Sequence, residues 1–185
     1  MPGEDRRVEK TKKIIDDACW ALLRDKSLEE ITVRDIADYA KINRATFYRY
    51  HVDKYDWIEK QIVAHLQELA ALSSTLHVTR DIPAMQLAFE SIFAHFEDCF
   101  DEYSILIRNR STAIFWDYLQ SFVTEMSRRH HPYTPRTPHS DLLLHFGVSA
   151  MVGVIEWWFA NNRPLSGREM AHELTNIHAR WLAGS

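Results

Sequence analysis

A short segment, residues 42–58, gathers side chains that can form hydrogen bonds but that a protein core cannot use. It reads INRATFYRYHVDKYDWI, and its polar members include Arg44, Thr46 and Arg49. A guanidinium group can donate two hydrogen bonds to the O6 and N7 atoms of guanine, and a hydroxyl can bond a base edge or a phosphate. The chemistry that these residue types favour is therefore non-covalent recognition of a nucleic acid.

The charge distribution supports this interpretation more than the total charge does. The net charge is −4, but residues 1–60 carry 13 basic and 13 acidic side chains, including all seven lysines. Between Lys41 and Lys54 the basic residues Lys41, Arg44, Arg49 and Lys54 face a single acid, Asp53. This local excess predicts one focused basic surface in an otherwise acidic protein.

Other chemistries find little support in the sequence. It contains no glycine-rich phosphate loop, no G-x-S-x-G and no H-E-x-x-H, so we expect no enzymatic activity. Ten histidines invite a metal hypothesis, but only His95 and Cys99 combine ligand types at i, i+4. Two ligands are fewer than the three or four that a zinc site needs. We therefore predict no metal site and no cofactor.

Composition indicates the compartment. The two cysteines, Cys19 and Cys99, form no disulfide framework, and the charged N-terminus has no apolar stretch of signal-peptide type. The longest apolar stretch, residues 147–160, is too short to cross a bilayer and is typical of a buried helix. We expect a cytoplasmic protein without a membrane partner.

The elements that must position the polar segment are helices. Apolar residues repeat at i, i+4 and i+8 over residues 7–25, which predicts an amphipathic helix. Thr32 followed by Asp35 resembles a capping box for a short second helix. Asn43 is a suitable N-cap for a third helix through about Tyr50, in which Phe47 points inward.

Two short helices joined by a tight turn and supported by an earlier helix match the helix-turn-helix arrangement. In such a pair the second helix enters the major groove of DNA. Arg44 and Thr46 would then meet base edges, while the side chains of Thr32, Tyr48, Tyr50 and Lys54 would reach phosphates. Ala45 and Arg49 lie on the same outward side of the third helix.

The rest of the chain is also helical. Amphipathic or apolar patterns predict helices over residues 53–76, 83–100, 103–109, 112–131 and 141–162, and a last helix that opens with Ser166 and Glu169. The helix over 141–162 is apolar on almost every side, so we expect other elements to cover it from both sides. The fold class is thus all-α, with about nine helices.

The segment ITVRDIADYAKINRATFYRYHVDKYDWI resembles the DNA-binding domain of the TetR family of bacterial transcriptional regulators. Hydrophobic, capping and aromatic positions agree in register with the family pattern over roughly residues 8–58. More weakly, GVIEWWFANNRPLSGREMAHEL (153–174) resembles the end of a ligand-binding domain in a subgroup common in Gram-positive bacteria. The resemblance implies a helix-turn-helix DNA-binding domain over residues 1–55 and an effector-binding and dimerisation domain over residues 56–185.

Three positions depart from the family pattern. Lys41 stands where glycine is usual, so a left-handed turn there would be strained. Asn43 replaces the usual serine or threonine cap, and His51 replaces a phenylalanine. The resemblance implies DNA contacts at Asn43 and His51 too.

For the C-terminal domain the resemblance implies two further sites. A small-molecule effector of unknown identity would bind an apolar cavity, with candidate lining residues Phe89, Phe93, Phe96, Trp116, Phe122 and Met126. The last two helices of each subunit would form a four-helix bundle in a homodimer, with candidate interface residues Val152, Ile155, Trp158, Met170, Leu174, Ile177 and Trp181.

Together these features predict a transcriptional repressor that binds a palindromic operator as a homodimer and is released by a small molecule. Two alternatives stay open. The C-terminal domain could bind a protein partner instead of a small molecule, which a filled core between residues 83 and 160 would favour. Alternatively, the chain could be a small-molecule or metal carrier whose DNA-binding motif is vestigial, which a failure to bind any DNA would favour.

Overall fold

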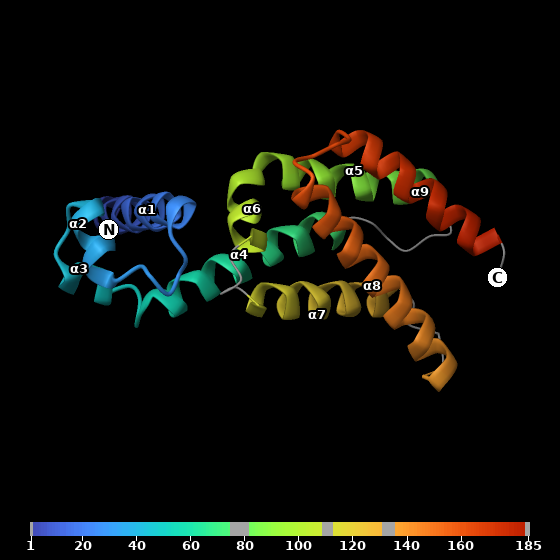
Figure 1. Ribbon diagram of the computed structural model, residues 1–185, viewed down its shortest axis with the longest axis horizontal. Helices are drawn as coiled ribbons and strands as arrows, with labels where there is room; N and C mark the ends of the chain where they lie inside the picture. The colour runs from blue at the N-terminus through green and yellow to red at the C-terminus, as the bar shows by residue number, and fades with distance from the viewer. Residues whose placement is uncertain (1, 75–81, 109–112, 131–135, 184–185) are drawn as a thin grey trace. The chain divides into compact units, whose positions relative to one another are not determined.

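The computed structural model describes residues 2–74, 82–108, 113–130 and 136–183. Over these residues it is helical and without strands, which confirms the all-α prediction. The helices of the described residues are α1 (Pro2–Asp25), α2 (Val33–Ala40), α3 (Arg44–Tyr48), α4 (Lys54–Ser74), α5 (Ile82–Asp98), α6 (Phe100–Arg108), α7 (Ala113–His130), α8 (Pro138–Ala160) and α9 (Gly167–Ala183), as drawn in Figure 1.

By its internal contacts the chain divides into two units. The described residues of the first unit run to Val63, and those of the second begin at Ala64. The division falls inside α4, which continues from one unit into the other, whereas the boundary predicted from the sequence, between residues 55 and 56, lies at the start of this helix.

The first unit consists of α1, α2, α3 and the first part of α4 around a small apolar core. Ile15 and Cys19 of α1, Ile36 of α2 and Phe47 of α3 are all at most 2% exposed. The indole N–H of Trp57 donates to Asp16 Oδ1 at 2.7 Å, which ties α4 to α1. These contacts fix the position from which α3 presents its outer face.

The second unit packs its helices in pairs. Helices α5 and α9 lie side by side, and α7 lies along α8 (Figure 1). Rings at right angles fill the centre: Phe93 lies 5.3 Å from Trp158, and Phe96 lies 4.9 Å from Tyr103, between ring centroids. Such edge-to-face pairs stabilise a core beyond the burial of their area.

Helix α8 differs from its prediction in length and in burial. Thr137 caps it through a box with Ser140, and Pro138 occupies its first turn, so it begins earlier than residue 141. Its 23 residues make it long and apolar enough, by length and composition, to cross a bilayer, and only 22% of its apolar window is buried. The apolar stretch is thus part of a longer helix than predicted, and one helix of this kind is weak evidence for a membrane span. The prediction that other elements cover the helix from both sides is wrong for the single chain. Its side chains at Leu142, Leu143, Phe146 and Trp157 are exposed.

Candidate nucleic-acid interface

The second helix begins with a complete capping box. The amide of Asp35 donates to the Thr32 hydroxyl oxygen at 3.2 Å, and Asp35 Oδ2 accepts from the Thr32 amide at 2.8 Å and from its hydroxyl at 2.6 Å. The two bonds from Thr32 lower the pKa of the Asp35 carboxyl. The hydroxyl that we predicted to reach a phosphate therefore already donates its single proton to Asp35, and it has no donor left for a phosphate oxygen, which only accepts.

The turn between α2 and α3 has the left-handed conformation expected where family members carry glycine. Lys41 has φ 54° and ψ 42°, and the amide of Ile42 donates to Ala37 O at 3.0 Å. Asn43 then caps α3, because its Oδ1 accepts from the Ala45 amide at 2.9 Å. This turn sets the angle between the two helices, so a residue without the freedom of glycine holds it at some cost in strain.

Helix α3 is short but continues as helical turns. The amides of Tyr50 and His51 both donate to Phe47 O at 3.0 Å. Phe47 is fully buried and anchors the inner side. The predicted contact residues on the other sides are open to solvent: Arg44, Ala45, Tyr48 and Arg49 are exposed, and Thr46 and Tyr50 are half-buried. The structure thus brings these six predicted residues together on one accessible helix.

His51 has a different environment. Only 8% of it is exposed, its ring lies 5.3 Å from that of Phe47, and its Nδ1 lies 3.6 Å from Asp56 Oδ2. Burial lowers the pKa of its imidazole, and the ammonium of Lys60 lowers it further. A side chain so enclosed has little surface for a phosphate, and the proposed interface therefore excludes His51.

Lys54 also has partners within the protein. Its ammonium donates to Glu29 O at 2.9 Å and to Ile31 O at 2.7 Å, in the loop between α1 and α2. These two bonds leave one of its three donors for a phosphate. We therefore expect Lys54 to stabilise this loop in addition to any contact with DNA.

Sequence reasoning passed over other exposed side chains around α3. Tyr39 near the end of α2 is 57% exposed, and Val52 just after α3 is 77% exposed. Large apolar groups seldom remain open to solvent without a function when they lie in one region. The signal in the sequence was weak, because Tyr39 precedes the polar segment 42–58, and Val52, although inside it, has no side-chain group that can form a hydrogen bond.

The candidate effector residues differ in burial and do not line one common cavity among the described residues. Phe93 and Phe96 are 1% exposed and pack in the aromatic centre, whereas Phe89, Trp116 and Phe122 are half-buried. The side chain of Met126 lies outside the described residues. Phe115, which the sequence analysis did not select, is the buried neighbour of Trp116.

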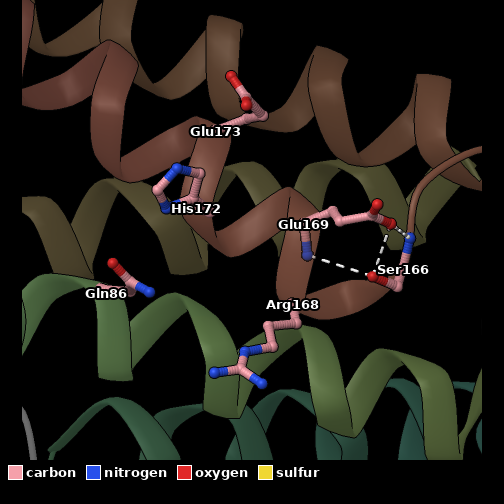
Figure 2. A pocket seen from close by; sticks show the side chains of 6 residues that line it. All are labelled: Gln86, Ser166, Arg168, Glu169, His172 and Glu173. Carbon is pink, nitrogen blue, oxygen red and sulfur yellow. Dashed lines mark hydrogen bonds between the residues drawn. The ribbon is translucent and has the colours of Figure 1, made fainter.

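The surface of the second unit has a hollow that lies away from the candidate effector residues. It is lined by Gln86 of α5 and, at the start of α9, by Ser166, Arg168, Glu169, His172 and Glu173 (Figure 2). Ser166 and Glu169 bond each other there as a helix cap, at 2.7 Å between Oγ and Oε2. The lining is polar and contains none of the predicted effector residues, so this hollow does not match the apolar cavity we expected.

Most of the candidate dimer residues are buried within the single chain. Ile155, Trp158, Met170 and Leu174 are at most 7% exposed, so a partner subunit cannot reach them. Val152 is half-buried, Ile177 is 60% exposed, and the side chain of Trp181 lies outside the described residues. The four buried assignments are corrected here: these residues face the core of their own unit.

The opposite side of α8 carries the accessible apolar surface. Its exposed residues recur at helical spacing, and we call them the α8 stripe: Leu142, Phe146, Ser149, Ala150, Gly153, Trp157 and Ala160. A helix that is apolar all round gives no periodicity that shows which of its sides is buried, so the exposed side could not be read from the sequence.

Comparison with known proteins supports the N-terminal motif and extends it. Residues 15–59 match the family model described as bacterial regulatory proteins of the tetR family. Residues 84–179 match a model described as a transcriptional regulator C-terminal region. An uncharacterized HTH-type transcriptional regulator, YxbF of Bacillus subtilis (strain 168), is 37% identical over 54 residues. That match spans 29% of this chain and only 14% of the relative's length.

Solved structures show the same fold over nearly the whole chain. A TetR transcriptional regulator from Streptococcus agalactiae 2603V is similar with a TM-score of 0.70 and 21% identity, covering 95% of this chain and 97% of that one. A TetR-family regulator from Syntrophomonas wolfei str. Goettingen reaches a TM-score of 0.72 at 16% identity, covering 96% of each chain. With a capped, solvent-facing third helix and two family models that together span both units, the chain belongs to the TetR family of transcriptional regulators.

Proposed function

We propose that this DNA-binding regulator is a repressor that recognises a palindromic operator as a homodimer and leaves it when an effector binds. The observation that carries the proposal is the outer face of α3. Arg44 in its first turn and Arg49 at its C-cap are exposed, Tyr48 is 56% exposed, and Phe47 anchors the helix from within. A rigid helix that presents cations and hydrogen-bonding groups is what insertion into a major groove requires.

The individual contacts follow from the chemistry of the side chains. Arg44, in the first turn of α3, would bond guanine O6 and N7, and Thr46 would meet a base edge or a thymine methyl. Tyr48 and Tyr50, together with the remaining donor of Lys54, would bond phosphates, which set the register of the protein without reading sequence. Asn43 and Ala45 would lie against the same groove.

Dimerisation would cover the α8 stripe. Small residues at Ser149, Ala150 and Gly153 stand between larger apolar ones at Phe146 and Trp157. A Cβ added at Gly153 would meet nothing within 4 Å, so the chain itself leaves this place open for a close neighbour. Two recognition helices held in this way would lie about one turn of DNA apart, roughly 34–36 Å, or somewhat more.

Release from DNA would act through α4, because this helix belongs to both units. An effector that binds one arrangement of the second unit better than another shifts the population of α4 positions, and with it the spacing of the two α3 helices. This proposal places the protein in the cytoplasm, where its DNA is.

A second candidate is a regulator that responds to a protein partner in place of a small apolar molecule. The packed centre of the second unit favours it, because Phe93, Phe96, Trp158 and Phe159 fill that space with ring contacts of 5.0–5.7 Å between centroids. In that case, adding a protein partner identified by pull-down would alter the affinity for the operator. Apolar small molecules would leave that affinity unchanged.

The decisive experiment is selection of bound sequences from a random duplex pool, using the purified protein beside Arg44→Ala. We expect a palindrome from the parent protein. The variant should lose about 1–3 kcal/mol of binding and read one base pair in each half-site less sharply. Arg168→Ala, an exposed arginine of α9, is the matched control and should leave the motif unchanged.

The opposite results are equally informative. An identical motif and affinity in Arg44→Ala would show that α3 does not read DNA through this residue. If the parent protein recovers no motif even at low salt, the DNA-binding role itself is wrong and a carrier function gains support.

A further inference from the structure

Four side chains with metal-ligating atoms meet in the second unit. His65 and Glu68 come from α4, His95 from the last turn of α5, and Cys99 follows α5 directly. One ligand atom from each lies within 4.8 Å of the other three. We call these residues the His-Glu-Cys cluster. Sequence spacing alone singled out His95 and Cys99, and the packing of α4 beside them supplies the other two.

The spacing of the ligand atoms is close to that of a four-coordinate site. Zinc binds nitrogen and carboxylate oxygen at about 2.0–2.2 Å and thiolate sulfur at about 2.3 Å, which places ligand atoms roughly 3.3–3.8 Å apart. The ligand atoms of the cluster therefore need to approach one another by only about 1 Å. Glu68 can supply that movement, because its side chain is 63% exposed and has room to turn.

The orientation of His95 suits a ligand. Its Nε2 lies 3.1 Å from the hydroxyl of Tyr103, and its Nδ1 lies 3.7 Å from Glu68 Oε2. When Nε2–H donates to the tyrosine, Nδ1 carries the lone pair and faces the other ligands. Tyr103 is fully buried, so it holds the imidazole in place as the supporting partners of metal-bound histidines do.

The electrostatics favour a cation. The carboxylates of Glu102, Glu68 and Asp98 place negative charge near the Cys99 thiol. A cation placed among these groups would remove the excess negative charge and bind the thiol as a thiolate, with one proton released to solvent.

We propose that the His-Glu-Cys cluster binds one divalent transition-metal ion, with zinc as the expected ion. Two imidazoles, a thiolate and a carboxylate are the mixed nitrogen, sulfur and oxygen donors that zinc accepts in a four-coordinate site. The cluster contains none of the residues proposed to contact DNA, so its metal binding does not depend on the proposed function.

One consequence does rest on the proposed function. A bound ion would join α4 to the end of α5, and α4 is the helix that continues into the DNA-binding unit. Zinc would then act as the effector, or as one effector, by favouring one position of α4.

The test uses the full-length protein after removal of metal with a chelator. Titration with Co²⁺ should give the ligand-field bands of tetrahedral cobalt and a thiolate-to-cobalt charge-transfer band, saturating at one ion per chain. Competition with a chromophoric chelator should give a Kd for Zn²⁺ below about 1 μM. Cys99→Ala should lose the charge-transfer band and weaken Zn²⁺ binding by about 100-fold or more, and Glu68→Gln by about 10-fold.

Matched controls come from the same chain. Cys19→Ala removes the other cysteine, which is buried in the first unit, and His172→Ala removes an exposed histidine of α9. Both should bind Co²⁺ and Zn²⁺ as the parent does. Circular dichroism of each metal-free variant confirms that lost binding does not reflect unfolding.

Two results would overturn the site: no saturable binding of Co²⁺ or Zn²⁺ by the parent, or undiminished binding in Cys99→Ala. Tighter binding of Ni²⁺ than of Zn²⁺ would overturn the zinc assignment. Operator affinity, measured with and without Zn²⁺, decides the regulatory consequence separately. Equal affinities would refute zinc as an effector and leave the metal site standing, and failure of all DNA binding would refute the proposed function alone.

Discussion

Two residues of the first unit have a backbone conformation or an environment that lowers the stability of the fold. Lys41 adopts a left-handed backbone in the turn that orients α3, and His51 occupies a buried position beside Phe47 and Asp56. Both positions were flagged in the sequence because they depart from the family pattern. The structure shows what each departure does, and each makes a separate prediction.

Replacing Lys41 by glycine should stabilise the protein. The left-handed conformation costs a non-glycine residue about 1–2 kcal/mol. Glycine avoids this strain, but it loses more conformational entropy on folding, which costs about 0.5–1 kcal/mol. We expect Lys41→Gly to raise the free energy of unfolding by about 0.5–1 kcal/mol in urea titrations. Lys41→Ala is the control and should bring no gain, since alanine keeps the strain. A higher free energy of unfolding in Lys41→Ala would show that the lysine side chain, and not the backbone conformation, destabilises the parent protein.

Replacing His51 by phenylalanine should alter how stability depends on pH. Burial lowers the pKa of the folded imidazole below the ordinary value of about 6.5, so the unfolded chain takes up the proton first as the medium becomes acidic. Stability is therefore full above about pH 6.5 and is lost as the pH falls from there towards the lower folded pKa.

His51→Phe removes this loss. Urea unfolding at about pH 7.5 and pH 5.5 should show a smaller decrease for the variant than for the parent, by up to about 1 kcal/mol. His172→Phe, at an exposed position of α9, should leave the parent's decrease unchanged. Equal decreases in His51→Phe and the parent would mean that His51 is not the titrating group.

At the scale of elements, the junction of α5 and α9 is packed tightly enough to require glycine. The amide of Gly167 donates to Glu97 Oε1 at 2.7 Å. A Cβ on Gly167 would lie 2.9 Å from Glu97 Cδ and 3.1 Å from Phe93 Cβ. The first of these neighbours is the end of a flexible side chain, but the second is fixed to the backbone of α5.

Gly167→Ala should therefore destabilise the protein by about 1 kcal/mol, because the clash outweighs the better helix propensity of alanine. Thermal or urea unfolding measures this. In a Glu97→Ala background the same substitution should cost less, since one clash and one hydrogen bond are already gone. An unchanged cost in that background would place the strain at Phe93 alone.

At the scale of the whole molecule, the α8 stripe is the surface through which we propose that the chain forms a dimer. Phe146 is 65% exposed within the single chain, as large apolar groups rarely are unless another surface covers them. A charge introduced there would have to be buried without a partner in a homodimer, which costs far more than a charge on a free surface.

Phe146→Glu should therefore shift the protein from dimer to monomer in analytical ultracentrifugation and weaken operator binding at low protein concentration. Leu87→Glu is a matched control, because Leu87 of α5 is similarly apolar and 60% exposed but lies off the stripe. A variant at Phe146 that stays dimeric, or a parent that is monomeric, would show that the dimer does not form through α8.

The N-terminal unit was largely predictable from the sequence because its signals are local. Thr32 and Asp35 are three residues apart, Asn43 precedes its helix directly, and Phe47 is the buried residue of α3. The caps formed as predicted, since a cap depends on residues within a single turn. Even the strain at Lys41 could be expected, from the absence of glycine at that position.

Other features depended on tertiary structure. Helix α8 is apolar on nearly every side, so no periodicity could tell that Ile155 and Trp158 face inward while Phe146 and Trp157 face outward. His51 is polar by type, and only the packing of α4 shows that it is enclosed. The sequence by itself determined an all-α regulator with a helix-turn-helix, through caps and helical spacing that act over a few residues. Only the tertiary structure decided which face of α8 is open and which four potentially metal-binding side chains meet between α4 and the end of α5, because those contacts join residues far apart in the chain.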